Sequence, residues 1–327
     1  MNMLNKELLV IAGPTGSGKT KLALNLARQI SLEIISADSR QVYKDLDYIS
    51  NRRRLNDDQY MQFSKQDNYW IQNNIKIHGY DVIDLHQHYS VGQFVDFSLP
   101  MINNIWELNQ LPVIVGGTGY YIDALLGIKS YSQIAQDSDL RKSLATKSIP
   151  ELQKKLQEFD PASFESMPVH EQLNPHRLIR YIEIARVTGN IKQGVIYSPL
   201  KEFIKKENIQ IKYLYLFNNL PSLYQGVDVW VSQLINSSEY INELTLISKS
   251  EDVNRELLAG LLIKEGLQYL QNEISKEELY RTNCSRLHHY IRRQLIWFNQ
   301  SPFTQKINIS DHGWEDQLIL DLKSRYN

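Results

Sequence analysis

The chain has 327 residues, of which 42% are hydrophobic and 22% charged, so it exceeds one average domain and can bury a core, which excludes a disordered or fibrous protein. Its formal net charge of −1 excludes a strong overall basic field, so any contact with RNA has to come from local patches. Its one cysteine, Cys284, excludes an internal disulfide and a zinc site built on paired cysteines, as is typical of a reducing cytosol.

The start of the chain does not have the pattern of a signal peptide, because the apolar run at residues 8–11 is short and leads directly into a glycine-rich loop. A membrane span would need about 20 apolar residues in a row, and the sequence contains no such stretch. We therefore expect a cytoplasmic protein that makes no contact with a membrane.

The first third of the chain alternates short apolar runs with helical segments. Residues 8–12, 32–35 and 112–115 are predicted to be buried strands, and residues 22–27 lie in a helical segment. Strands separated by helices indicate βαβ units. The sequence therefore predicts an α/β fold in which a parallel sheet is flanked by helices.

A glycine-rich loop follows the first predicted strand and matches the pattern G-x-x-x-x-G-K-[ST] at every fixed position. Its glycines let successive backbone N–H groups point into one anion-sized nest at the start of a helix. Lys19 adds a cation, and Thr20 offers a hydroxyl to a Mg²⁺ that bridges the phosphates. The pattern defines a P-loop for a di- or triphosphate but no particular reaction. The predicted phosphate-binding residues are Gly13, Pro14, Thr15, Gly16, Ser17, Gly18, Lys19 and Thr20.

The predicted strand at residues 112–115 ends in the run GGTG at residues 116–119. An enzyme that hydrolyses a nucleoside triphosphate usually has an acidic residue at the end of such a strand, where it holds the Mg²⁺ shell. The missing carboxylate weakens the ATPase and GTPase hypotheses.

Asp38 follows the predicted strand at residues 32–35. A carboxylate at the C-terminal end of a parallel strand projects into the crevice where such sheets bind ligands, so Asp38 would face the phosphate loop. Asp38 is equally consistent with a helix N-cap and with a Mg²⁺ ligand acting through water. The local sequence leaves these three roles open.

The pattern becomes entirely helical between residues 128 and 191, where apolar residues recur at helical spacing. Residues 209–217 again have the pattern of a strand, and Ser275 with Glu278 predicts a helix that runs to about Phe298. We therefore predict a P-loop core over residues 1–127, an all-helical insertion over 128–195, and the resumed core with C-terminal helices over 196–327. In the last helix, Arg286, His289 and Arg293 should share one face.

Three motifs together resemble one family. Residues 13–20 (GPTGSGKT), 35–43 (ISADSRQVY) and 116–121 (GGTGYY) resemble, in order and spacing, the tRNA dimethylallyltransferase (isopentenyltransferase) family. The likeness extends through Asp139-Leu140-Arg141, residues 174–180 and residues 292–298, and so spans most of the chain.

The resemblance implies a reaction. The loop would hold the diphosphate of dimethylallyl diphosphate, and the exocyclic N6 of a flipped adenine, 3′-adjacent to the anticodon of tRNA, would attack C1 of the donor. Lys19, the loop amides and a Mg²⁺ on Thr20 would stabilise the leaving diphosphate, and Asp38 would act as the general base. The catalytic residues would then be Asp38, Lys19 and Thr20. By the same analogy the protein would act as a monomer.

The resemblance also implies contacts with the anticodon stem-loop, although surface arginines are more often part of solvated ion pairs, and Glu183 is a possible partner for Arg180. The run at residues 52–54 is a further candidate phosphate contact. Tyr120 and Tyr121 are predicted either to line the prenyl pocket or simply to pack. The tRNA-binding residues implied by the resemblance are Asp38, Ser39, Arg40, Gln41, Thr118, Arg141, His176, Arg177, Leu178, Ile179 and Arg180.

The chain departs from the family pattern in its C-terminal third. Gly226 and Trp230 stand where the family has arginines, one of which helps to hold the diphosphate. Three alternatives stay open: an adenylate prenyltransferase, a P-loop small-molecule kinase, and, because of these departures, an RNA-binding relative without catalytic activity.

Overall fold

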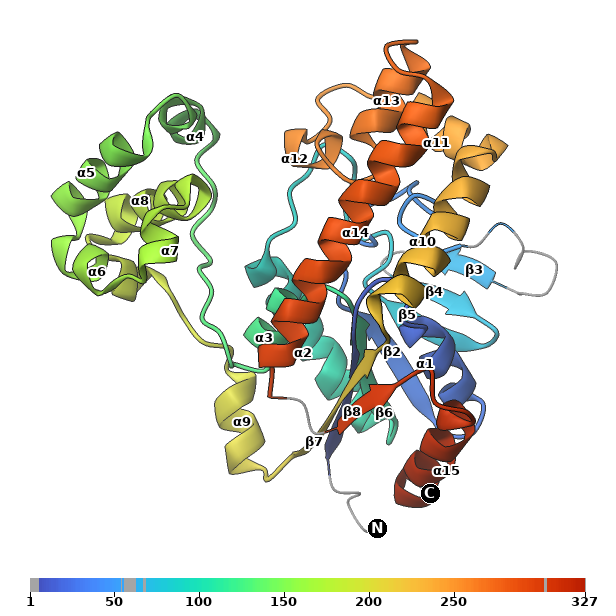
Figure 1. The fold of residues 1–327 in the computed structure, drawn as a ribbon. Helices are drawn as coiled ribbons and strands as arrows, with labels where there is room; N and C mark the ends of the chain where they lie inside the picture. The colour runs from blue at the N-terminus through green and yellow to red at the C-terminus, as the bar shows by residue number, and fades with distance from the viewer. Residues whose placement is uncertain (1–5, 54, 56–62, 67–68, 303–304, 327) are drawn as a thin grey trace.

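The computed structural model describes residues 6–53, 55, 63–66, 69–302 and 305–326, and Figure 1 shows their arrangement. Within these residues the core is one sheet of eight strands in the order β3-β4-β5-β2-β6-β1-β7-β8. The strands are β1 (Glu7–Ala12), β2 (Leu32–Ser36), β3 (Phe63–Gln66), β4 (Tyr69–Gln72), β5 (Ile75–His78), β6 (Leu111–Gly116), β7 (Gln210–Phe217) and β8 (Gln305–Asn308).

The predicted α/β fold is confirmed, with a correction at one edge of the sheet. Strands β5, β2, β6, β1, β7 and β8 run parallel, whereas β3 and β4 are antiparallel additions beside β5. The sheet is therefore mixed rather than purely parallel. The sequence analysis missed β3, β4, β5 and β8 because each has only four residues and the run is too short for a clear apolar pattern.

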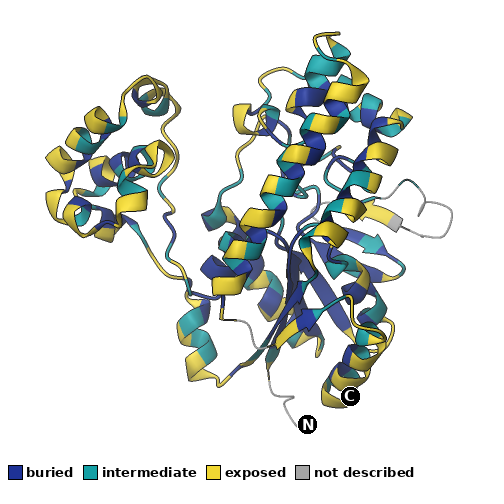
Figure 2. Cartoon of the chain, viewed as in Figure 1, coloured by how far each residue is buried: buried dark blue, intermediate teal, exposed yellow. Residues whose placement is uncertain are grey.

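Helices cover both faces of the sheet, and consecutive residues of β1 supply the two layers. Leu9 and Ile11 pack with α1 (Lys19–Ala27) and α15 (Trp314–Tyr326). Leu8 and Val10 point to the other face, against α2 (Val91–Glu107), α3 (Gly119–Leu125) and α9 (Leu200–Lys206). A strand buried on both faces explains the unbroken apolar run in the sequence, and Figure 2 shows the buried centre.

A group of C-terminal helices stands above the carboxyl ends of the parallel strands (Figure 1). These are α10 (Leu220–Ile235), α11 (Ser238–Lys249), α12 (Arg255–Leu258), α13 (Lys264–Leu270) and α14 (Lys276–Gln300). Ser275 accepts the backbone N–H of Glu278 at the start of α14, which confirms the predicted helix start. The helices share a buried cluster with Val42, Leu46 and Ile49 from the loop after β2. They thus form a roof over the edge of the sheet where ligands bind in such folds.

The segment between α3 and α9 is helical, as predicted. It contains α4 (Ser138–Ala145), α5 (Ile149–Phe159), α6 (Pro161–Ser166), α7 (Val169–Gln172), α8 (Pro175–Thr188) and the 3-10 helix η1 (Ile191–Gly194). These helices enclose a small hydrophobic cluster of their own, centred on Leu144, Leu156 and Ile182. The segment that leads into the insertion and the segment that leads out of it form one isolated antiparallel β-bridge, between Tyr131 and Ile196. The exact division into three parts remains a prediction.

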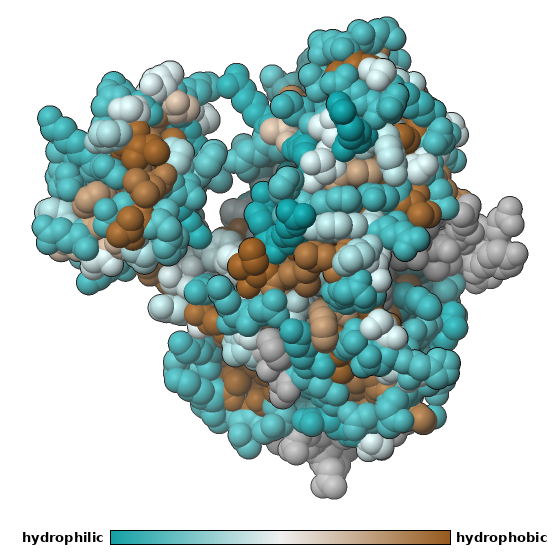
Figure 3. All heavy atoms as spheres, in the orientation of Figure 1, coloured by the Kyte–Doolittle hydropathy of each residue, from teal (hydrophilic) through white to brown (hydrophobic). Residues whose placement is uncertain are grey.

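The helical insertion stands to the left of the core in Figure 1, and Figure 3 shows an open gap between the two. Arg141 of α4 reaches Glu256 of α12 across this gap, with 3.3 Å between Nη1 and Oε1. The Glu256 side chain is 59% exposed, so this ion pair adds little stability. Among the described helices, none is long and apolar enough to cross a lipid bilayer.

Candidate active site

The phosphate loop has the backbone geometry that its glycines predict. Gly16 and Gly18 have φ of 84° and 78°, in the left-handed region that favours glycine. A Cβ at Gly13 would stand 2.4 Å from the carbonyl oxygen of Leu216, so no larger residue fits between β1 and β7 there. Helix α1 begins directly afterwards at Lys19. The loop therefore curls at the positive end of a helix, as an anion nest requires.

Lys19 lies half-buried at the base of this nest. Its Nζ donates a hydrogen bond of 2.7 Å to the carbonyl oxygen of Pro14. Burial lowers the pKa of Lys19 to about 8 from an ordinary value of 10.5, and the nearby charge of Asp38 opposes part of that change. The ammonium is thus poorly solvated, which strengthens its attraction for a bound anion.

This lowered pKa predicts how donor binding depends on pH. A diphosphate is attracted by protonated Lys19, so the contribution of Lys19 to its affinity should be nearly constant below pH 8. Above pH 8 the affinity should fall by up to about ten-fold per pH unit as Lys19 loses its proton. Calorimetric titration of diphosphate from pH 6.5 to 9.5 measures this. A Lys19→Met variant should bind more weakly and lack the fall, and an equal fall in that variant would contradict the assignment.

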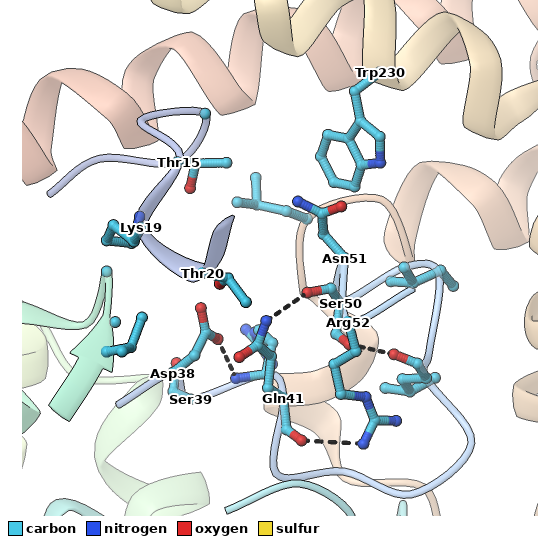
Figure 4. Close-up of a pocket in the computed structure, with 18 of the residues that line it drawn as sticks. Thr15, Lys19, Thr20, Asp38, Ser39, Gln41, Ser50, Asn51, Arg52 and Trp230 are labelled. Atoms are coloured by element: carbon cyan, nitrogen blue, oxygen red, sulfur yellow. Dashed lines mark hydrogen bonds between the residues drawn. The ribbon is translucent and has the colours of Figure 1, made fainter. Parts of the chain in front are cut away.

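The loop and Asp38 line one cavity of about 960 Å³ at the carboxyl edge of the parallel strands. Its floor includes the end of β6 and the turn after β2, and its roof is formed by α10, α14 and residues 259–263, which join α12 to α13. The Asp38 carboxylate lies on the side of the cavity that carries Lys19 and Thr20, while Trp230 reaches in from the opposite wall (Figure 4). The predicted phosphate nest and the predicted base therefore lie beside one another on one side of a shared cavity.

Asp38 does not cap a helix. The residues after it form turns, and its Oδ1 accepts the backbone N–H of Arg40 at 2.8 Å. The alternative of a helix N-cap is therefore wrong. This local bond uses one carboxylate oxygen and orients the side chain, which leaves the other oxygen for chemistry in the cavity.

Ser39, Gln41 and Thr118 are tied into the same turn. The backbone N–H of Ser39 donates to Oγ1 of Thr118 at 3.1 Å. The carboxamide of Gln41 accepts from Ser36 Oγ at 2.7 Å and donates to the carbonyl oxygen of Ser50 at 3.3 Å. In this conformation the amide end and the oxygen end of Gln41 both have protein partners, so an adenine would have to displace them.

The residues that the resemblance places near RNA on the insertion divide into two kinds. His176 and Arg177 are exposed at the start of α8. Leu178 is fully buried in the hydrophobic cluster of the insertion, and Ile179 packs against that cluster. The side-chain contact expected for Leu178 is therefore wrong, because its side chain has no surface to offer.

Arg141 and Arg180 share one buried carboxylate. Glu183, with a side chain 1% exposed, accepts Nε of Arg141 at 2.7 Å and Nη1 of Arg180 at 3.1 Å. Arg180 also donates to the carbonyl oxygen of Ile134 at 2.7 Å. The predicted alternative of an Arg180–Glu183 ion pair is confirmed. Both arginines hold the insertion together, whatever contact they also make with RNA.

Arg52 is not available as a phosphate contact. Its side chain is fully buried, pairs with Asp47 at 2.8 Å and Asp81 at 2.5 Å, and lies over the ring of Trp70. The prediction for Arg52 is therefore wrong, because its charge is already neutralised inside the protein. Arg54 lies outside the described residues.

Tyr120 and Tyr121 pack rather than line the cavity. The ring of Tyr121 stacks on Phe94 with centroids 4.8 Å apart, and the Tyr120 hydroxyl donates to the carbonyl oxygen of Ser130 at 3.0 Å. Neither belongs to the cavity wall. Of the two roles considered for these residues, packing fits the structure.

Helix α14 supplies cavity residues that the motif analysis did not assign. The predicted common face of Arg286, His289 and Arg293 does turn toward the cavity. Tyr290 joins them there, and its pKa is raised by burial and by the nearby charge of Asp38. Helical periodicity predicts that the two arginines share a face, but it does not assign Tyr290 to the cavity. Only the packing of α14 over the sheet shows which of its faces lines the cavity.

Fold and site together define a P-loop α/β protein with a helical insertion. A family model described as IPP transferase matches residues 41–301, and one described as isopentenyl transferase matches residues 6–75. The chain belongs to the IPP transferase family.

Several relatives match almost the whole chain. The tRNA dimethylallyltransferase of Endomicrobium trichonymphae is 31% identical, covering 90% of this chain and 93% of that protein. That of Finegoldia magna is 29% identical, covering 94% and 93%. The crystal structure of the tRNA isopentenylpyrophosphate transferase from Bacillus halodurans is 26% identical with a TM-score of 0.64, covering 98% and 95%. A eukaryotic dimethylallyltransferase, 21% identical, shares the fold with a TM-score of 0.70, covering 98% and 80%.

Proposed function

We propose that the protein is a tRNA dimethylallyltransferase, which transfers the prenyl group of dimethylallyl diphosphate to N6 of the adenine 3′-adjacent to the anticodon and releases diphosphate. The observation that carries the proposal is that Lys19 of the phosphate loop and Asp38 line the same cavity. Relatives that bear this enzyme's name match over nearly their full lengths, which supports the same substrate class.

In the proposed reaction the phosphate loop and Asp38 have separate tasks. The loop amides and Lys19 bind the diphosphate and stabilise its charge as the bond between C1 and oxygen breaks. The adenine N6 forms the new bond to C1, and Asp38 accepts the proton that N6 loses. Diphosphate leaves with the electron pair of the broken bond, so atoms and charge balance without another reactant.

Mg²⁺ is the proposed cofactor. The oxygen donors beside the loop suit this ion, because Thr20 and Asp38 both line the cavity next to the place for the phosphates. A Mg²⁺ held by Thr20 and the diphosphate would neutralise part of the charge of the leaving group. Mg²⁺ normally takes only one or two protein ligands in such sites, so a larger cluster of acids is not required.

The tRNA is proposed to approach along the inner face of α14. His289 and Arg293 give this wall basic and hydrogen-bonding groups for the RNA backbone, whereas the Arg286 guanidinium is paired with Glu265. His176 and Arg177 stand exposed on the insertion, on the other side of the gap. A monomer is proposed by analogy with the family, and the tRNA substrate fits a cytoplasmic location.

One experiment tests the proposed function. The protein is mixed with Mg²⁺, labelled dimethylallyl diphosphate and either unmodified tRNA or AMP, and label transfer is followed. We expect label on N6 of the anticodon-adjacent adenine of tRNA. Label on AMP alone would replace the proposal with an adenylate prenyltransferase, and no transfer to either acceptor would remove it.

Trp230 predicts a limit on the length of the donor. Val227, one turn earlier on α10, comes within 3.5 Å of a Cβ built at Gly16, so Trp230 is about 4.5 Å further along the helix axis from the loop. With Ile49, Leu262 and Leu287 it forms an apolar wall where a prenyl chain leaving the diphosphate would lie.

Replacing this indole should therefore admit longer donors. We expect Trp230→Ala to improve kcat/KM for geranyl diphosphate relative to dimethylallyl diphosphate by at least about ten-fold, roughly 1.4 kcal/mol. Trp106→Phe serves as the control, since the Trp106 indole bonds the carbonyl oxygen of Glu7 away from the cavity. An unchanged ratio in Trp230→Ala would show that the prenyl group lies elsewhere.

A further inference from the structure

A buried glutamine of α14 holds the phosphate loop. Gln294 is 5% exposed, and its Oε1 accepts the backbone N–H of Thr15 at 2.9 Å. Its Nε2 donates to the carbonyl oxygen of Gly117 at 2.9 Å. One side chain, 279 residues away from Thr15 in sequence, thus joins the phosphate loop to the turn after β6.

The first of these bonds removes a donor from the nest. Thr15 is the third residue of the loop, after Gly13 and Pro14, and proline has no N–H. The Thr15 N–H is already bonded, and the Ser17 N–H donates to the carbonyl oxygen of Pro14 at 3.2 Å, so the amides left for an anion are those of Gly16, Gly18 and the residues that begin α1. The carboxamide oxygen also places partial negative charge at this rim of the nest, where it repels a further phosphate oxygen.

The second bond locates the carboxamide between β1 and β6. These strands are neighbours, with Ala12 opposite Gly116, so the end of β6 lies beside the phosphate loop. In P-loop enzymes that use nucleoside triphosphates, the acid at the end of such a strand helps to hold the metal that bridges the last two phosphates. Here Gln294 fills that region so closely that a Cβ at Gly117 would lie 2.5 Å from Nε2.

We propose that Gln294 makes this phosphate loop selective for a diphosphate over a triphosphate. It occupies the space into which a third phosphate would extend, and it withdraws the Thr15 amide that would meet it. The inference rests on the proposed function and deepens it, since the donor and the product both carry two phosphates. A cellular triphosphate such as ATP is thereby kept out of the donor site, although the loop motif alone accepts either ligand.

Binding of two inorganic probes tests this selectivity. Isothermal calorimetry with Mg²⁺ gives the dissociation constants of diphosphate and tripolyphosphate. We expect the wild-type protein to prefer diphosphate, and Gln294→Ala to reduce that preference by at least about ten-fold. Gln294→Met fills most of the same space but frees the Thr15 N–H, so it should keep more of the preference than Gln294→Ala does. A wild-type protein without the preference, or an Ala variant in which both affinities change by the same factor, would overturn the proposal.

Asn283 provides a matched control on the same helix. It is also a buried carboxamide of α14, and it bonds the backbone N–H of Leu262 and the carbonyl oxygen of Leu279, both at 3.0 Å and away from the phosphate loop. Asn283→Ala should lower the melting temperature but leave the ratio of the two affinities unchanged. Because the probes need no tRNA and no prenyl group, selectivity can be found even if prenyl transfer is absent, so failure of the inference and failure of the proposed function are distinguishable.

Discussion

Replacing Asp38 with asparagine is expected to lower the rate of prenyl transfer to tRNA by about two to four orders of magnitude. The amine of adenine is a weak nucleophile and must lose a proton as it attacks. An asparagine has the shape of the aspartate but cannot accept that proton at neutral pH. Single-turnover kinetics, with the enzyme in excess over tRNA and with saturating dimethylallyl diphosphate, measures the chemical step directly.

The Asp38→Asn variant should keep its fold, because Oδ1 of asparagine can still accept the Arg40 N–H that Asp38 accepts at 2.8 Å. Diphosphate affinity should not fall, since the change removes a negative charge near Lys19. Trp106→Phe again serves as the control, because the Trp106 indole donates to the carbonyl oxygen of Glu7 away from the cavity. A rate close to that of the wild type in Asp38→Asn would exclude Asp38 as the base.

The central fold and the placement of Lys19 and Asp38 in one cavity were predictable because their causes are local in sequence. Strands buried on both faces leave unbroken apolar runs, as in β1, β2, β6 and β7. The loop after β1 and the acid after β2 follow from the rule that parallel sheets bind ligands at the carboxyl ends of their strands. That Asp38 lies at the carboxyl edge of the sheet, beside the phosphate loop, therefore followed from the order of strands and loops along the chain.

The features that the sequence did not predict depend on contacts between distant segments. Gln294 meets the phosphate loop only because α14 crosses above it, and a glutamine in a helix has no pattern that reveals such a partner. Leu178 lies in a motif that suggests an RNA contact, yet the periodicity of α8 places it in the cluster of the insertion. Where a family motif and helical periodicity disagree about a side chain, periodicity predicted its burial better here.

For Arg52 the sequence predicted a phosphate contact, whereas the structure shows a buried ion pair that stabilises the fold. Its guanidinium bonds Asp47, Asp81 and the carbonyl oxygen of Gln41. It also lies 4.9 Å from the ring centroid of Trp70 and 5.6 Å from that of Tyr80. A cation held in this way joins the loop that lines the cavity to β4 and to the turn after β5. Its removal leaves two nearly buried carboxylates, and Lys65 is then the one cation beside them among the described residues.

We therefore expect Arg52→Ala to lower the free energy of unfolding by about 3–5 kcal/mol, as measured by urea denaturation. Arg186→Ala is the matched control, since the Arg186–Asp137 pair is 54% and 48% exposed and its loss should cost under about 1 kcal/mol.

The salt dependence of tRNA binding separates this structural role of Arg52 from a phosphate contact. Loss of a phosphate contact lowers the slope of log affinity against log salt by about one. Arg293→Ala, on the inner face of α14, should show that change, whereas Arg52→Ala, studied well below its melting temperature, should leave the slope unchanged because its charge never reaches the RNA.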